Sequence, residues 1–313
     1  MTAYNVLIAD GLNENGQAIL RSSTNVDDRP GISPEELLQE IKDYDALIVR
    51  GRTKVTAEVV DAAKRLKVVG RAGVGVDNID LDASKSHGVT VVNAPMSTSL
   101  AVTELAFGLM LALAREIPRA DAGMKQGEWL KKELAGVELF GKTLGIVGMG
   151  RIGGEVGRRA VIFGMNIIAY DPLLPDEVIR QRWAKPADLD DLYARSDYIS
   201  FHLPLNDMTH SMVGEQAFGS MKRGVRIICA ARGGIIDEFA LLAALESGQV
   251  AGAALDVFSS EPPGVTDLVR HPKVIATPHV GAQTAEAQAR AAEDVANEVL
   301  AALKGEPLRW KII

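Results

Sequence analysis

The stretch Leu144-Gly-Ile-Val-Gly-Met-Gly-Arg-Ile-Gly153 has the pattern of a strand, a glycine-rich turn and the start of a helix. Its first four residues predict a buried strand, and the segment that follows predicts a helix. Gly148 permits a tight turn, Gly150 lacks a Cβ that would block a pyrophosphate, and Gly153 lets the helix pack closely on the strand. The N–H groups and the dipole at the start of that helix favour a bound diphosphate, so the stretch predicts a dinucleotide site.

A second apolar strand, residues 166–170, ends at Asp171, 23 positions after Gly148. A carboxylate at this point can accept hydrogen bonds from both ribose hydroxyls and would repel a 2′-phosphate, which favours NAD over NADP. The alternative is a purely structural turn with a solvated Asp171. The strand before the turn, the helix after it and the second strand that ends in Asp171 favour the cofactor site.

The composition is that of a globular protein: 313 residues, 47% hydrophobic and 24% charged. This length allows two domains that each bury a core. The net charge is −7 and the isoelectric point is near 5.4, which gives no basic surface for nucleic acid or an anionic membrane. An anionic substrate would therefore need a local cluster of Arg or Lys.

The sequence also indicates the cellular compartment of the protein. The single cysteine, Cys229, excludes an intrachain disulfide and indicates a reducing environment. The N-terminus has no signal-peptide pattern, and the longest apolar segment, residues 105–114, is too short to span a bilayer. We therefore expect a cytoplasmic protein.

Strand and helix patterns alternate along the chain, which is typical of parallel sheets covered by helices. A polar break is predicted around Asp27-Asp28-Arg29-Pro30-Gly31, and the segment Ser33-Pro34-Glu35-Glu36 has the N-cap and first turn of a helix. A long helix is predicted at 97–115, followed by a charged connection at 117–140. Strands are predicted at 5–9, 46–50, 67–71, 89–93, 198–202, 226–230, 252–257 and 274–276, and further helices at 13–20, 55–63, 81–86 and 284–303.

These patterns predict an α/β protein of two Rossmann-like or flavodoxin-like parallel-sheet domains with a cleft between them. If the last helix packs on the N-terminal sheet, the first domain is discontinuous. We then expect a substrate-binding domain of residues 1–95 plus 284–313 and an NAD-binding Rossmann domain of residues 96–283.

Three polar side chains, Arg232, Glu261 and His279, follow predicted strands at the edge where parallel sheets bind ligands. Hydride transfer to a 2-oxo acid needs a cation for the carboxylate, an acid for the developing alkoxide and a group that supports that acid. Arg232 suits the first role, His279 the second and Glu261 the third. Taken singly, each has an ordinary alternative: a strand cap, a solvated carboxylate before proline, and a histidine in a turn.

Several motifs together resemble the D-isomer-specific 2-hydroxyacid dehydrogenases, and the similarity runs nearly end to end. They are Arg71-Ala-Gly-Val-Gly-Val-Asp-Asn78, the glycine-rich turn, Ala231-Arg-Gly-Gly234, Ala253-Ala-Leu-Asp-Val-Phe258, Glu261-Pro-Pro263 and Pro278-His-Val-Gly281. Within the family the chain is most similar to the members that oxidise 3-phospho-D-glycerate to 3-phosphooxypyruvate with NAD, the first step of serine biosynthesis.

This resemblance implies that Arg232, Glu261 and His279 are catalytic and that Asp256 bonds the nicotinamide carboxamide. No metal is expected. The implied cofactor contacts are Gly148, Gly150, Arg151, Ile152, Gly153, Asp171, Ala230, Ala231, Asp256 and Gly281, and His202 is a candidate for the adenine pocket.

The resemblance also places the substrate between the domains. Backbone N–H groups of the turn Gly73-Val74-Gly75 are expected to bind the substrate carboxylate with Arg232, which leaves the nearby cations for a distal phosphate. The implied substrate contacts are Arg50, Arg52, Arg71, Gly73, Val74, Gly75, Asn93 and Lys131, the last of which is expected to reach across a dimer; ordinary solvated surface cations are the alternative.

Four residues depart from the phosphoglycerate pattern: Val74 for Thr, Gly51 for Ser, Cys229 for Asn and Leu203 for a polar residue. Another 2-hydroxyacid dehydrogenase, acting on hydroxypyruvate, glyoxylate, sulfolactate or D-lactate, therefore stays open. So does an NADH-sensing binding protein of the corepressor type. Because the sequence ends at Ile313, we expect no regulatory domain and no feedback by serine through one. A homodimer or homotetramer is expected, with contacts through residues 100–114 and the Trp129 segment.

Overall fold

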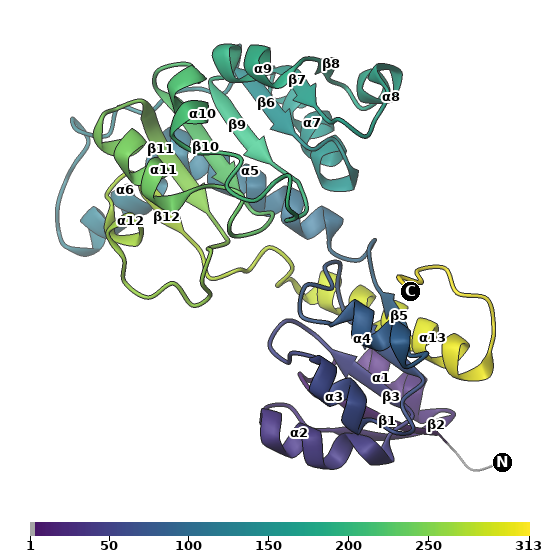
Figure 1. Cartoon of the computed structure of the whole chain (residues 1–313). Helices are drawn as coiled ribbons and strands as arrows, with labels where there is room; N and C mark the ends of the chain where they lie inside the picture. The colour runs from purple at the N-terminus through teal and green to yellow at the C-terminus, as the bar shows by residue number, and fades with distance from the viewer. Residues whose placement is uncertain (1–3) are drawn as a thin grey trace. The chain divides into compact units, whose positions relative to one another are not determined.

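The computed structural model describes residues 4–313 as two compact units. Unit 1 consists of the described residues up to Ser99 together with Ala282–Ile313, and unit 2 is Leu100–Gly281. Figure 1 shows that each unit has a central sheet with helices on both faces. The first three residues of the predicted substrate-binding domain lie outside the described part of the chain.

Unit 1 contains a five-stranded parallel sheet in the order β2-β1-β3-β4-β5, the flavodoxin-like order. Its strands are β1 (Tyr4–Ile8), β2 (Thr24–Asp28), β3 (Ala46–Val49), β4 (Val68–Arg71) and β5 (Thr90–Asn93). Its helices are α1 (Glu14–Arg21), α2 (Pro34–Glu40), the 3-10 helix η1 (Ile41–Asp43), α3 (Ala57–Ala62), α4 (Leu81–Ser86) and α13 (Ala285–Lys304).

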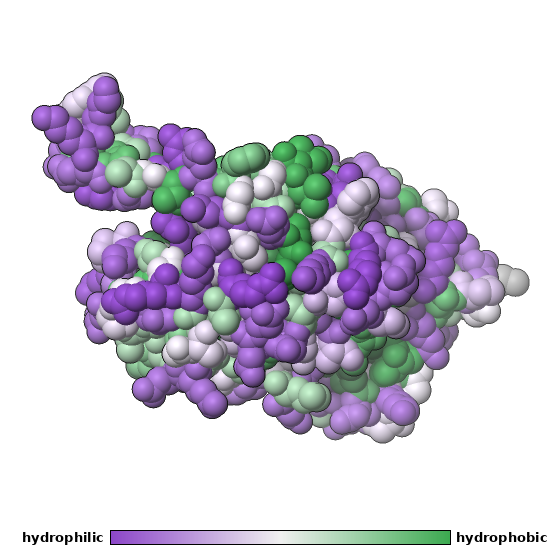
Figure 2. All heavy atoms as spheres, turned by 90° about the horizontal axis from the view of Figure 1, so that it is seen from above, coloured by the Kyte–Doolittle hydropathy of each residue, from purple (hydrophilic) through white to green (hydrophobic). Residues whose placement is uncertain are grey.

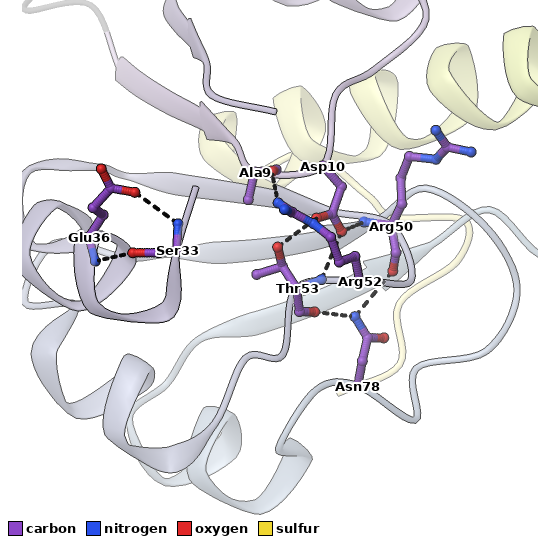
Figure 3. Close-up of polar contacts among 8 residues, drawn as sticks. All are labelled: Ala9, Asp10, Ser33, Glu36, Arg50, Arg52, Thr53 and Asn78. Atoms are coloured by element: carbon purple, nitrogen blue, oxygen red, sulfur yellow. Dashed lines mark hydrogen bonds and ion pairs between the residues drawn. The ribbon is translucent and has the colours of Figure 1, made fainter. Parts of the chain in front are cut away.

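Both faces of this sheet are buried. Leu7 and Leu47 pack with side chains of α2, η1 and α3 on one face, while Val6 and Ile8 pack with α1 and α13 on the other. The central strand β3, with the sequence ALIV, is therefore a continuous apolar run, as buried parallel strands are. Helix α2 begins at the predicted N-cap Ser33, which forms a reciprocal capping box with Glu36 (Figure 3).

Unit 2 contains a seven-stranded parallel sheet in the order β12-β11-β10-β9-β6-β7-β8. The order reverses at β6, so β6 and β9 form the topological switch point of a Rossmann sheet. The strands are β6 (Thr143–Val147), β7 (Asn166–Tyr170), β8 (Lys185–Pro186), β9 (Tyr198–Phe201), β10 (Val225–Cys229), β11 (Val250–Leu255) and β12 (Val274–Ala276). The helices are α5 (Ser99–Arg115), α6 (Ile117–Lys125), α7 (Arg151–Ile162), α8 (Asp176–Gln181), α9 (Leu189–Arg195), α10 (Glu215–Ser220), α11 (Glu238–Glu246) and α12 (Asp267–Arg270).

Two apolar layers cover the second sheet. One contains Phe107 and Met110 of α5 with Val156 of α7, and the other contains Leu192 of α9 and Leu241 of α11. The layers hold the strands in register, so the carboxyl ends of β6, β9, β10 and β11 lie at one edge of the sheet. That edge carries the site residues described below.

The predicted fold class is confirmed: both units are parallel α/β sheets. The predicted polar break at residues 27–31 starts too early, because Asp27 and Asp28 belong to the edge strand β2, whereas residues 29–31 do form a turn after it. Of that strand only Thr24 is buried, so backbone pairing with β1 forms it in the absence of an apolar run. The connection after α5 also starts with a helix, α6. Among the described residues, none of the helices combines the length and the apolar character needed to cross a bilayer.

Candidate active site

The glycine-rich turn lies between β6 and α7 at the switch point of the second sheet. Gly148 has φ +93° and donates its N–H to the carbonyl of Tyr170 at 2.9 Å. A Cβ on Gly153 would lie 2.1 Å from the Gly148 carbonyl oxygen, so α7 can approach the turn only with glycine there. A Cβ on Gly150 would instead meet open space. The turn therefore has the close packing and the open face that a pyrophosphate requires.

Asp171 follows β7 and lies beside this turn. Its Oδ2 accepts the N–H of Met149 at 2.9 Å, and its Oδ1 accepts the N–H of Leu173 at 3.0 Å. These bonds fix the carboxylate beside the glycine-rich turn, as the predicted ribose contact requires. Arg151 and Ile152 begin α7 next to the turn, with Arg151 exposed. The residues present thus fit an NAD molecule.

Arg182, which follows α8, also supports the turn. It donates a hydrogen bond to the carbonyl of Met149, and its Cδ lies 3.3 Å from the position of a Cβ on Gly154. It therefore brings a positive charge to the glycine-rich turn. Sequence reasoning missed it because Arg182 lies in a polar segment without a motif.

His202 follows β9 on the other side of the switch point. One ring nitrogen, Nε2, lies 2.8 Å from the hydroxyl of Ser200, and burial lowers the pKa of the imidazole to about 4. The ring is therefore neutral at physiological pH. Leu203 lies directly over the glycine-rich turn, 2.8 Å from the position of a Cβ on Gly148.

Asp256 holds the segment that carries His279. Its side chain is 1% exposed and accepts three hydrogen bonds, from the Thr277 hydroxyl at 2.6 Å and from the N–H groups of Val280 and Gly281 at 2.8 Å each. The segment after β12 therefore turns back on the end of β11. His279 sits in this turn with φ +52°, a left-handed conformation that a non-glycine residue rarely adopts.

His279 and Glu261 form a hydrogen-bonded pair. The Nδ1 atom of His279 lies 2.7 Å from Oε2 of Glu261, and the two side chains are 48% and 37% exposed. The other carboxylate oxygen of Glu261 accepts the N–H of Phe258 at 3.1 Å. Because Nδ1 is occupied, Nε2 of His279 is the nitrogen that can exchange a proton with a ligand.

Arg232 is carried to the same edge by β10. The buried residues Ala230 and Ala231 precede it, and its Nη1 donates to the Ala231 carbonyl at 2.7 Å. A Cβ on Gly233 would lie only 1.8 Å from the carbonyl oxygen of Phe258. The Arg232 segment thus lies directly against the loop that carries Glu261. The structure brings all three predicted catalytic residues to one edge of unit 2.

Glu238 supports this loop from the first turn of α11. Its Oε1 accepts the N–H of Ser259 at 2.7 Å and also a hydrogen bond from the Ser259 hydroxyl. Acidic residues are common in the first turn of a helix, so the sequence gives no indication that Glu238 contacts Ser259. Nearby, burial raises the pKa of the Cys229 thiol to about 11, which makes it an inert core group.

The predicted substrate residues of unit 1 lie at the carboxyl edge of its sheet. Arg52 forms an ion pair with Asp10, whereas the Arg50 side chain points away from Asp10 (Figure 3). Asn93 donates to the carbonyl of Val74 at 2.6 Å and so holds the predicted anion-binding turn. Among residues 4–313, neither the N–H of Val74 nor that of Gly75 donates to another group of the chain.

Two further side chains complete the predicted set. The guanidinium of Arg71 lies over Gly73, whose Cα has no side chain to obstruct it, and donates to the Ala72 carbonyl at 3.3 Å. Lys131 is exposed on the connection after α6 in unit 2. Across the described part of the chain, no group of three or more His, Cys, Asp or Glu side chains is placed to hold a metal ion.

Residues 107–281 match the NAD binding domain of the D-isomer specific 2-hydroxyacid dehydrogenases. The chain is 48% identical over 302 residues to a D-3-phosphoglycerate dehydrogenase of Methanocaldococcus jannaschii, covering 96% of this chain and 58% of that protein. The chain therefore spans little more than half the length of this curated relative.

Solved structures of similar length have the same fold. A glyoxylate reductase from Paecilomyes thermophila is 34% identical with a TM-score of 0.90, and 100% of this chain and 99% of that one are covered. A D-lactate dehydrogenase from Aquifex aeolicus, solved with NAD and lactic acid, is 30% identical with a TM-score of 0.85 and 96% coverage of both chains.

Proposed function

Because the chain belongs to the D-isomer specific 2-hydroxyacid dehydrogenase family and carries its NAD-binding domain, we propose that it oxidises 3-phospho-D-glycerate to 3-phosphooxypyruvate. This reaction is the first step of serine biosynthesis. The likeness to a D-3-phosphoglycerate dehydrogenase at 48% identity favours this substrate over glyoxylate or D-lactate, whose enzymes are 34% and 30% identical.

The observation that carries the proposed chemistry is the bond between His279 Nδ1 and Glu261 Oε2 at 2.7 Å, next to the Arg232 segment. An imidazole held at one nitrogen by a carboxylate is suited to accept a proton at the other. A guanidinium at the same edge supplies the fork that pairs with a carboxylate.

In the oxidising direction, Nε2 of His279 takes the proton of the substrate's C2 hydroxyl. Glu261 orients the ring and stabilises the imidazolium that forms. Arg232 binds the substrate carboxylate and so fixes C2. Bound NAD supplies the acceptor for the hydride that leaves C2. Asp171, Arg151 and the three glycines would hold the adenine-side ribose and the pyrophosphate of that cofactor.

The phosphate of the substrate needs cations, because the net charge of −7 does not attract a dianion. We assign this role to Arg50 and Arg71 of unit 1 and to Lys131. The N–H groups of Val74 and Gly75, in the turn held by Asn93, are suited to the substrate carboxylate.

Steady-state formation of NADH tests the proposal. We expect a preference for 3-phospho-D-glycerate over D-glycerate, D-lactate and sulfolactate of about 100-fold in kcat/KM, equivalent to about 2.7 kcal/mol. Preference for a substrate with an uncharged tail would discard the serine-pathway role but keep the dehydrogenase. Tight NADH binding without turnover of any substrate would favour an NADH sensor.

We further propose a cytoplasmic homodimer or homotetramer. The face seen in Figure 2 is largely hydrophilic with apolar patches, and unit 2 exposes Leu100, Trp129, Phe140 and Ile162. Such side chains are typical of protein interfaces. Size-exclusion chromatography with light scattering measures the assembly. Substitution Trp129→Ala should shift it toward the monomer, and an unchanged mass would remove this segment from the interface.

A further inference from the structure

The segment 50–53 after β3 carries Arg50, a proposed ligand of the anionic tail, and it has no regular secondary structure. A loop of this kind presents a side chain reproducibly only when other groups hold its backbone. Asp10 and Asn78 hold this one from opposite sides (Figure 3).

Asp10 binds the N–H side of the segment. Its carboxylate is 4% exposed and follows β1, the strand next to β3. Its Oδ2 accepts the N–H groups of Arg50 at 2.7 Å and Thr53 at 3.2 Å. Its Oδ1 accepts the Thr53 hydroxyl at 2.6 Å. Burial alone would raise the pKa of Asp10, but the hydrogen bonds from Thr53 and Arg50 outweigh it and lower the pKa, so the group is ionised.

Asn78 binds the carbonyl side of the same segment. Its Nδ2 donates to the carbonyl of Thr53 at 2.7 Å and to that of Arg50 at 3.1 Å. The first and last residues of the segment are therefore each held at both backbone polar groups.

The side chains of the two arginines in this segment point in different directions. Arg52 turns back, its Nε lying 3.2 Å from Asp10 Oδ1 and its Nη2 donating to the Ala9 carbonyl at 3.0 Å. Arg52 balances the charge of the buried Asp10 carboxylate, and these contacts occupy its guanidinium. Arg50 points away from Asp10, and its Nη2 lies at the long distance of 3.4 Å from Gln283 Oε1.

We propose that Asp10 and Asn78 are positioning residues that present the Arg50 guanidinium to the substrate's anionic tail, and that Arg52 serves as the counter-ion of Asp10. The inference rests on the proposed function, because it takes the tail to be a phosphate. It separates two neighbouring arginines that the sequence alone does not distinguish.

The test is a double-mutant cycle read as substrate preference, the ratio of kcat/KM for 3-phospho-D-glycerate to that for D-glycerate. We expect Arg50→Gln to lower this ratio at least tenfold, and Asp10→Asn to lower it about tenfold through KM for the phosphorylated substrate, with KM for NAD unchanged. The double variant should match Arg50→Gln within about twofold, since Asp10 acts only through Arg50.

Asp45→Asn is the matched control. Asp45 is 5% exposed, pairs with Arg65 and accepts the N–H of Asn5, but it lies at the opposite end of the same sheet. This variant should lose stability as Asp10→Asn does while its preference stays within about twofold of wild type. If Asp10→Asn does not fold, Thr53→Val removes one of the same bonds and should lower the preference about threefold.

If the wild-type enzyme shows no preference for the phosphorylated substrate, the proposed function is refuted. The proposed role of Arg50 is then refuted as well. A wild-type preference that survives Asp10→Asn, or that falls equally in Asp45→Asn, overturns this inference alone. Additive losses in the double variant would also overturn it.

Discussion

Gly233→Ala should disable the enzyme without touching any catalytic side chain. A Cβ at this position would lie 1.8 Å from the carbonyl oxygen of Phe258 and 2.2 Å from its carbonyl carbon. Cβ atoms essentially never come within 3.0 Å of such atoms, so one backbone segment must move by about 1.2 Å. One of the two segments carries the Phe258 N–H that binds Glu261, the partner of His279, and the other carries Arg232, so either movement disturbs the site.

A shift of about 1 Å in a catalytic group can cost about 100-fold in rate, and overpacking costs about 1–3 kcal/mol of stability. We therefore expect kcat to fall about 100-fold and Tm to fall by a few degrees. The assay is steady-state NADH formation together with thermal unfolding, and NADH fluorescence reports whether the cofactor still binds.

Gly219→Ala is the control. This glycine lies in α10, and a Cβ there meets no atom within 4 Å. Alanine is the better helix former by about 1 kcal/mol, so this variant should keep wild-type activity and be slightly more stable. If Gly233→Ala retains kcat within about twofold of wild type, the reasoning that links this contact to the position of Glu261 is wrong.

Three further changes test other parts of the site. His279→Gln should lower kcat by about 100-fold or more with little change in NADH binding, because it removes the proton acceptor; near-normal turnover would remove His279 from catalysis. Asp171→Ser should raise kcat/KM with NADP relative to NAD by about tenfold, since the repulsion of a 2′-phosphate is lost; an unchanged ratio would contradict the ribose assignment. The low pKa of His202, about 4, means that the unfolded chain binds this proton first as pH falls below about 6.5, so stability falls between pH 6.5 and 4. Between pH 7 and 4.5, the free energy of unfolding measured with urea should therefore fall by about 2 kcal/mol less in His202→Gln than in the wild type. An identical fall in both proteins would show that His202 does not have the low pKa assigned to it.

The local patterns of the sequence predict the fold well. The glycine-rich turn and Asp171 are neighbours in a single strand-turn-helix-strand unit, so their spacing alone places them together. The Ser33 cap is equally local, and the structure contains it. Strand β2 is different, because it forms through backbone pairing with β1 and leaves no apolar pattern to detect.

The site shows the same division between local and distant contacts. Arg232, Glu261 and His279 follow separate strands, and the parallel order of those strands predicts that they meet at one edge. Their catalytic roles stay predictions. Arg182, Glu238 and Asp10 act through bonds to the backbone of distant segments, and such bonds depend on three-dimensional approach rather than on motif or period.

The packing of α13 on the first sheet has a consequence for biosynthesis. Val295 and Val299 of this helix lie against Gly70 of β4, where even a Cβ would not fit, and Gly16 of α1 lies equally close to Ala292. Unit 2 is a continuous stretch of chain and can fold as soon as it has been synthesised, whereas the sheet of unit 1 lacks the α13 helix on one face until residues 282–313 have been synthesised. Translation thus delays the burial of this face of the first sheet, and its apolar side chains, such as Val68 and Val92, stay partly uncovered during that interval.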